Sequence, residues 1–98
     1  MKHHHYDVYM LKCSDGTYYT GVTNDLSRRF SEHQSGDDQK SYTYRRRPVQ
    51  LVFFADFSNI EYAIEKEKQI KKWSREKKEA LINENYELLP KLSKKHFK

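Results

Sequence analysis

The feature that most constrains this fold is a pair of short β-favouring runs joined by a tight-turn dipeptide. Residues 5–13 alternate in character, and residues 17–22 are rich in tyrosine, threonine and valine. Asp15-Gly16 lies between the two runs and is typical of a β-hairpin turn. We therefore expect the chain to begin with two antiparallel strands, whose apolar side chains the remaining residues must cover.

One helix and one further strand are predicted after this hairpin. Asn24 or Asp25 can cap a helix that runs to about Gln34 and is stopped by Gly36. The polar stretch 36–48 predicts a mobile loop. The nearly continuous apolar run 49–56 then predicts a third strand in a central or well-covered position of the sheet.

Two more helices complete the predicted fold. Ser58 followed by Glu61 is a capping box that opens a helix over about 59–73. Ser74 can cap a last helix that runs to about residue 85. The predicted class is therefore α+β, with a small three-stranded antiparallel or mixed sheet flanked by helices in the order β-β-α-β-α-α.

Length and composition exclude several classes of protein. A chain of 98 residues allows one small domain, expected over 1–85, and a flexible basic tail over 86–98. Eight tyrosines and five phenylalanines can build its core, although only 36% of the residues are apolar. The lone Cys13 excludes an internal disulfide and a multi-cysteine zinc site. Without a membrane-length apolar run or a visible signal peptide, we expect a soluble cytoplasmic protein with no membrane partner.

Positive charge is concentrated towards the end of the sequence. Nineteen Lys and Arg against fourteen Asp and Glu give a net charge of +5, and the whole excess falls in residues 65–98. This pattern suits a polyanion such as nucleic acid, and it equally suits a solvated basic helix. The residues expected to contact nucleic acid are Arg45, Arg46, Arg47, Lys71, Lys72, Arg75, Lys77 and Lys78.

A carboxylate falls on the apolar face of the second predicted helix. At about 100° per residue, Ile60, Ala63 and Ile64 form the inward stripe, and Glu67 lies near its middle. A charge in that position is costly unless a cation or a proton compensates it. Glu67 therefore either reaches solvent or pairs with Lys71, or it serves as a metal ligand or a general acid or base.

Four other polar residues could belong to the same site. Arg29 and His33 lie one turn apart at the edge of the buried side of the first helix. They could cap a tyrosine ring or a carbonyl group, or they could act in catalysis. Tyr9 and Tyr19 each fit ordinary strand packing, but Tyr9, Tyr19 and Arg29 recur at intervals of ten residues, and this recurrence favours a shared role.

Taken in order, these segments resemble the GIY-YIG endonuclease superfamily. The two half-motifs correspond to Asp7-Val8-Tyr9 and Tyr19-Thr20-Gly21. Residues 24–29 resemble the family's arginine helix, and residues 63–71 resemble its glutamate segment. The resemblance covers residues 6 to about 82, and the run 73–75 is similar to small single-domain bacterial members.

The resemblance implies a set of roles at matching positions. Tyr9, Tyr19, Arg29 and His33 would be catalytic, and Glu67 would hold one divalent cation, Mg²⁺ or Mn²⁺. It does not say which tyrosine is the general base. Three positions depart from the family pattern: Asp7 replaces a glycine, Thr20 replaces an isoleucine, and Glu79 stands where some members have asparagine.

Together these observations predict a metal-dependent endonuclease that hydrolyses DNA phosphodiester bonds. Because no specificity domain is evident, we expect the enzyme to select its substrates by nucleic-acid structure rather than by sequence. We also expect a role in DNA repair or recombination. One alternative is a non-catalytic or partner-dependent nucleic-acid-binding module on the same fold. RNA is a further possible ligand, and a protein partner could supply specificity.

Overall fold

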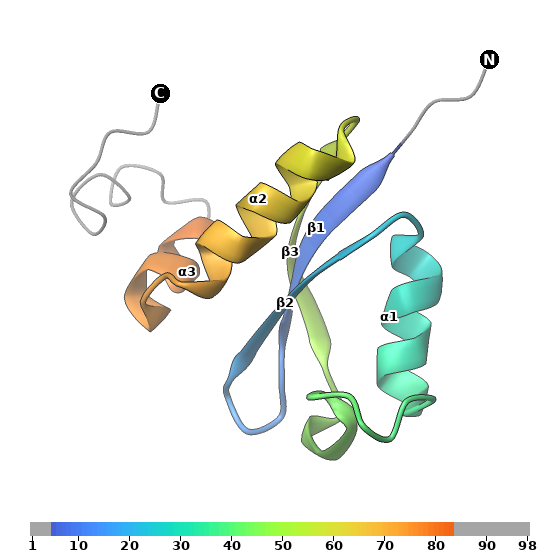
Figure 1. The fold of residues 1–98 in the computed structure, drawn as a ribbon. Helices are drawn as coiled ribbons and strands as arrows, with labels where there is room; N and C mark the ends of the chain where they lie inside the picture. The colour runs from blue at the N-terminus through green and yellow to red at the C-terminus, as the bar shows by residue number, and fades with distance from the viewer. Residues whose placement is uncertain (1–4, 84–98) are drawn as a thin grey trace.

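The computed structural model describes residues 5–83, and its elements follow the predicted order (Figure 1). The α+β class and the small three-stranded sheet are thereby confirmed. The predicted domain boundary at residue 85 and the tail 86–98 lie outside the described residues. In chain order, the elements are β1 (Tyr6–Lys12), β2 (Tyr18–Thr23), α1 (Leu26–Ser35), a short 3₁₀ helix η1 (Tyr44–Arg46), β3 (Gln50–Phe57), α2 (Ile60–Lys71) and α3 (Arg75–Ile82).

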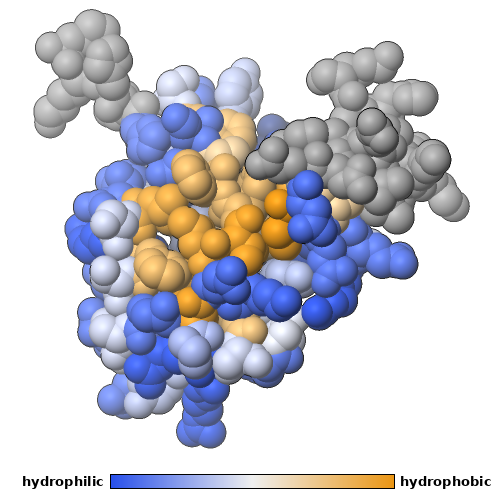
Figure 2. Space-filling model, turned by 180° about the vertical axis from the view of Figure 1, so that it is seen from behind, coloured by the Kyte–Doolittle hydropathy of each residue, from blue (hydrophilic) through white to orange (hydrophobic). Residues whose placement is uncertain are grey.

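The sheet has the strand order β2-β1-β3, and both strand pairs are antiparallel. Residues 49–56 were predicted to form a strand in a central or well-covered position; the central position is wrong, because β1 is central and β3 is an edge strand. Phe54 of β3 is 59% exposed. Figure 2 shows apolar surface gathered on the face of the molecule behind the view of Figure 1. The apolar character of β3 thus reflects one covered face and a partly open one.

Helices cover both faces of the sheet, and the alternation of β1 sorts its side chains between them. Val8 and Met10 lie in a core cluster with Ala63 and Ile70 of α2. Tyr9 and Leu11 face the other way, where they form a second cluster that also contains side chains of α1. The sheet therefore separates α1 from α2 and α3 (Figure 1).

The inward stripe of α2 differs from the predicted one. Ala63 and Ile70 are buried, whereas Ile60 and Ile64 are partly exposed at 38% and 37%. The difference arises because α2 is rotated so that the row through residues 63, 67 and 70 faces the sheet. Glu67 therefore still lies on the packed side of the helix, as the wheel predicted.

Capping side chains set the helix starts. Of the two candidates for α1, Asp25 is the cap, and its Oδ1 accepts a hydrogen bond from the Arg28 amide at 3.1 Å. The cap of α2 is Asn59 rather than the predicted Ser58, because Asn59 Oδ1 accepts from the amides of Glu61 and Tyr62 at 2.8 and 3.1 Å. Ser74 caps α3 as predicted.

The segment 36–48, for which the polar sequence predicted a mobile loop, is joined to the rest of the domain at several points. Thr43 within it is buried, and it also carries η1. The Arg46 carbonyl accepts a hydrogen bond from the Ser14 amide at 2.9 Å. The side chain of Gln34 makes two hydrogen bonds to the backbone of Val49, at 2.7 and 2.8 Å.

None of the helices within residues 5–83 has the length and apolar character that a membrane-spanning helix requires.

Candidate active site

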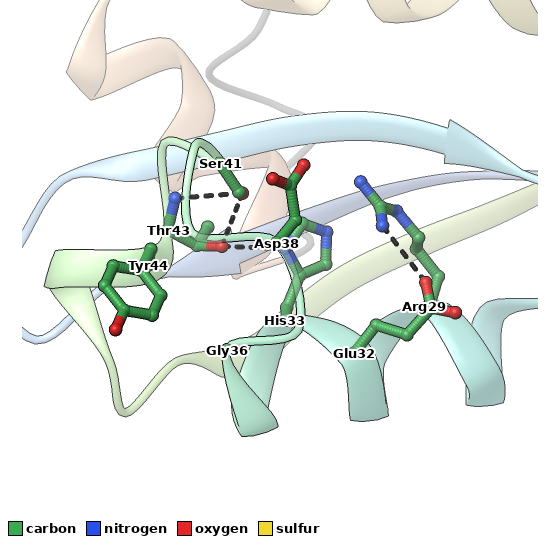
Figure 3. Close-up of a pocket in the computed structure, with 8 residues that line it drawn as sticks. All are labelled: Arg29, Glu32, His33, Gly36, Asp38, Ser41, Thr43 and Tyr44. Atoms are coloured by element: carbon green, nitrogen blue, oxygen red, sulfur yellow. Dashed lines mark hydrogen bonds and ion pairs between the residues drawn. The ribbon is translucent and has the colours of Figure 1, made fainter.

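A buried hydrogen-bonded chain connects the central strand to α1 and to the segment before η1. The Tyr9 hydroxyl lies 2.9 Å from His33 Nε2, and His33 Nδ1 lies 2.8 Å from Thr43 Oγ1. Thr43 Oγ1 in turn lies 3.0 Å from Ser41 Oγ (Figure 3). A neutral imidazole accepts at one nitrogen and donates at the other, so His33 can satisfy both partners at once.

Gly21 makes room for the ring of Tyr9. The two residues are directly opposite each other in the β1–β2 register. A Cβ atom at Gly21 would lie 2.6 Å from the Tyr9 hydroxyl oxygen and 2.7 Å from its Cζ atom. The glycine of the second half-motif is therefore required by the close approach of a tyrosine ring, since Gly21 is not one of the residues with a positive φ angle.

Tyr19 completes an aromatic cluster around His33. Its ring centroid lies 5.1 Å from that of His33 in an edge-on arrangement and 6.2 Å from that of Tyr9. Tyr9 is only 1% exposed, whereas Tyr19 is half-buried. Tyr19 is therefore the tyrosine of this cluster that is more accessible to a ligand.

Arg29 stands beside these rings on α1. Its Nη1 atom donates to Glu32 Oε1 at 3.1 Å, and its side chain is partly exposed. The guanidinium also interacts with the Tyr9 hydroxyl, and with five N–H donors it retains others that suit an anionic ligand. Figure 3 shows Arg29 and His33 extending from α1 in the same direction, along a small hollow that is also lined by Asp38 and Tyr44.

Burial keeps the Tyr9–His33 pair uncharged at neutral pH. Burial raises the pKa of the Tyr9 hydroxyl, the neighbouring Tyr19 raises it further, and Arg29 only partly opposes this. Burial also lowers the pKa of His33, as does Arg29, against the opposing effects of Glu32 and Asp38. At Tyr9 the loss of hydration therefore outweighs the nearby positive charge of Arg29.

Glu67 belongs to a different helix from Arg29 and His33. It is on α2, which packs on the opposite face of the sheet from α1. Its side chain is 13% exposed, and its Oε2 atom is 2.7 Å from Lys71 Nζ. Among the described residues, no hydrogen bond or ion pair joins Glu67 to the tyrosines, to Arg29 or to His33. The structure thus brings together four of the five predicted catalytic side chains.

The donor chemistry of Glu67 nonetheless fits a hard cation. One carboxylate that is not sealed from solvent can bind Mg²⁺, which usually keeps several waters and takes substrate oxygens as its other ligands. Lys71 is about half exposed, so its ammonium group can move away when a cation occupies the carboxylate.

Another group of potential metal ligands lies at the far end of β1, and the sequence reasoning missed it. This group consists of His5, Asp7 and Asp56, and their potential ligand atoms all lie within 4.8 Å of one another. Asp7 and Asp56 are directly opposite in the β1–β3 register. His5 Nε2 is 2.9 Å from Asp7 Oδ2, and His5 Nδ1 is 3.8 Å from Asp56 Oδ2, so the imidazole already contacts both carboxylates. Only the strand register, which is not encoded locally, could have revealed this group.

The predicted nucleic-acid contacts fall into two sets on either side of the hairpin turn. Arg46 of η1 contacts Asp15 through Nε at 3.1 Å, and Arg75 of α3 donates from Nη1 to the Gly16 carbonyl at 2.8 Å. Lys77 is buried, with its ammonium group 4.1 Å from the centroid of the Trp73 ring, and is the least accessible of the eight. The others are exposed or half-buried: Arg45, Arg46, Arg47, Lys71, Lys72, Arg75 and Lys78.

Glu79, one of the departures from the family pattern, contacts both Tyr18 and Arg75. Its Oε2 atom accepts a hydrogen bond from the Tyr18 hydroxyl at 3.0 Å and lies 3.1 Å from Arg75 Nε. Glu79 therefore ties α3 to the edge strand β2, and an asparagine there would lose the charge that pairs with Arg75.

Comparisons with known proteins agree with this fold. Residues 5–80 match the sequence model of a family described as the GIY-YIG catalytic domain. The chain is 46% identical over 83 residues to a UPF0213 protein of Bacillus pumilus, covering 85% of this chain and 83% of the relative. It is 44% identical over 88 residues to one of Haloquadratum walsbyi, covering 90% and 97%. The solution NMR structure of the UPF0213 protein of Bacillus halodurans is 42% identical and superposes with a TM-score of 0.53, covering 81% of this chain and 83% of that one.

Proposed function

Because this chain belongs to the family of GIY-YIG catalytic domains, we propose that it is a metal-dependent endonuclease. Its substrate would be DNA, selected by structure rather than by sequence, in repair or recombination. The observation that carries this proposal is the convergence of Tyr9, Tyr19, Arg29 and His33 from three separate elements.

Tyr19 is the better candidate for the general base. A base must come within hydrogen-bonding reach of the proton that it removes, and the Tyr9 hydroxyl is buried against His33. Tyr9 and His33 would then support Tyr19 from behind. His33 fixes the Tyr9 ring through its hydroxyl, and both rings pack against Tyr19.

Arg29 would bind the phosphate. Its guanidinium remains charged at all relevant pH values and can make two parallel hydrogen bonds to phosphate oxygens. Its ion pair with Glu32 orients the side chain without occupying every donor. Charge that grows on the phosphate oxygens during hydrolysis would be stabilised by these donors.

Glu67 would hold the divalent cation, Mg²⁺ or Mn²⁺. When bound, such a cation neutralises phosphate charge and eases departure of the leaving oxygen. The role of Glu67 itself is to present a carboxylate oxygen, which in the free protein is paired with Lys71.

That same ion pair favours the second candidate function, a nucleic-acid-binding module without turnover. A carboxylate that is neutralised by its own helix and has no contact with the Arg29 cluster among the described residues can be purely structural. The two candidates share the basic surfaces and differ in whether phosphodiester bonds are cut.

A cleavage screen separates the two candidates. Labelled duplex, flap, fork, junction and single-stranded DNA are incubated with Mg²⁺, with Mn²⁺ and with chelator. Arg29→Gln and Glu67→Gln are tested beside matched controls on the same helices, Arg28→Gln and Glu65→Gln. We expect nicking by the wild type and both controls only, with DNA binding retained by all.

Two results would contradict the endonuclease proposal. Equal cleavage by every variant would assign the activity to a contaminating nuclease. Binding without cleavage of any substrate, with either metal ion, would favour the binding module instead.

A further inference from the structure

Tyr42 extends the aromatic cluster to the surface. Its ring is 42% exposed and stacks on Tyr19, with ring centroids 6.0 Å apart and an angle of 25° between the planes. The guanidinium carbon of Arg46 lies 3.9 Å from the centroid of the Tyr42 ring. The planar groups of His33, Tyr19, Tyr42 and Arg46 therefore form a column, which runs from buried His33 to Arg46 at the surface.

This outer end of the column is held in place from two sides. Arg46 Nη1 donates to the Tyr42 carbonyl at 2.7 Å, and Arg46 Nε contacts Asp15 Oδ2 at 3.1 Å. The arginine is thus oriented both by its own loop and by the β1–β2 turn. A flat, partly exposed and positively charged surface is preformed, so little ordering is needed when a flat ligand binds.

We propose that the Arg46 guanidinium, which stacks on Tyr42 at the outer end of this column, is a stacking site for an unpaired nucleobase. Bases in a duplex already stack on neighbours at both faces, whereas an unpaired base can stack on an aromatic ring or a guanidinium plane. The positive charge of Arg46 also attracts the adjacent phosphate. The ligand is a single-stranded stretch of nucleic acid, either free or at a branch.

The inference rests on the proposed function for its meaning in catalysis. A base stacked on Arg46 would lie at the outer end of the column whose inner part contains Tyr19, the tyrosine assigned as the general base. The stacking site would therefore favour substrates in which an unpaired nucleotide lies near the bond to be cut.

The test measures binding, with chelator present so that no cleavage is required. Fluorescence anisotropy is recorded with a thymidine oligonucleotide, the same oligonucleotide made abasic, a uridine RNA oligonucleotide and a blunt duplex. The variants are Tyr42→Leu, Tyr42→Phe and Arg46→Gln. Tyr62→Leu is the matched control, because Tyr62 is 65% exposed on α2, away from the column.

Loss of one stacked base weakens binding by about 5- to 150-fold. We expect Tyr42→Leu to lose this much for the thymidine oligonucleotide and nothing for the abasic strand or the duplex. Tyr42→Phe and Tyr62→Leu should bind as the wild type does. The salt dependence should be unchanged in Tyr42→Leu and shallower in Arg46→Gln, since only the latter removes a charge.

The proposal is overturned if Tyr42→Leu binds both the thymidine and the uridine strands as the wild type does, or if it weakens all ligands equally. It is also overturned if the wild type does not prefer the base-bearing strand to the abasic one. A base-dependent loss seen only with uridine would assign the site to RNA. Absence of cleavage in the screen above would refute the endonuclease proposal and leave these binding results intact.

Discussion

Replacing Gly21 by alanine tests whether the close approach of Tyr9 holds the site together. The added Cβ would lie 2.6 Å from the Tyr9 hydroxyl oxygen, closer than such atoms can approach. The ring cannot simply swing away, because it is buried and its hydroxyl is bonded to His33 at 2.9 Å. Overpacking costs about 1–3 kcal/mol, and a stranded polar group costs a similar amount.

We therefore expect Gly21→Ala to lower the free energy of unfolding by about 3 kcal/mol, measured by urea denaturation. The matched experiment repeats the substitution in a Tyr9→Leu background, where the shorter side chain no longer reaches residue 21. There the alanine should cost less than about 1 kcal/mol, which gives a large coupling energy in the double-mutant cycle. Additive effects of the two substitutions would show that the Tyr9 contact is not the reason for the glycine.

Three further predictions concern stability. Burial holds the pKa of His33 below its value in the unfolded chain, so the unfolded state takes up a proton first as the pH falls. The free energy of unfolding should therefore decrease as pH drops through about 6.5. His33→Gln should weaken this pH dependence, and an unchanged pH dependence would contradict the assignment. Glu79→Ala should cost about 1 kcal/mol in urea denaturation and less in a Tyr18→Phe background, whereas equal costs would exclude the hydrogen bond as the cause. Asn59→Ala should cost about 1 kcal/mol and Ser58→Ala almost nothing, and the reverse order would restore Ser58 as the cap.

Local signals in the sequence were sufficient for the order of the elements. The turn dipeptide Asp15-Gly16, the caps Asp25 and Ser74 and the helix end at Gly36 all act within a few residues of the structure they determine. The edge position of β3 could not be predicted in this way, because strand order depends on contacts distant in sequence and an apolar run does not say which face is open.

The candidate site shows the same division. The ten-residue spacing predicted a relation among Tyr9, Tyr19 and Arg29, and the structure places these side chains together with His33. Thr43 and Tyr42 were missed because they lie in a polar stretch without periodicity, and only the folded chain brings that stretch against His33 and Tyr19. For Glu67, the wheel predicted partial burial but could not choose between a cation and Lys71.

The β1–β2 turn has a consequence for how this domain can vary. Exposed hairpin tips usually accept extra residues freely. Here, however, Asp15 contacts Arg46 of η1, and the carbonyl group of Gly16 accepts a hydrogen bond from Arg75 of α3. Asp15 is itself anchored by Thr17 through two hydrogen bonds. An insertion of a single residue would therefore break the contact of either Arg46 or Arg75 with the turn. The length of this turn thus fixes the distance between the two basic surfaces.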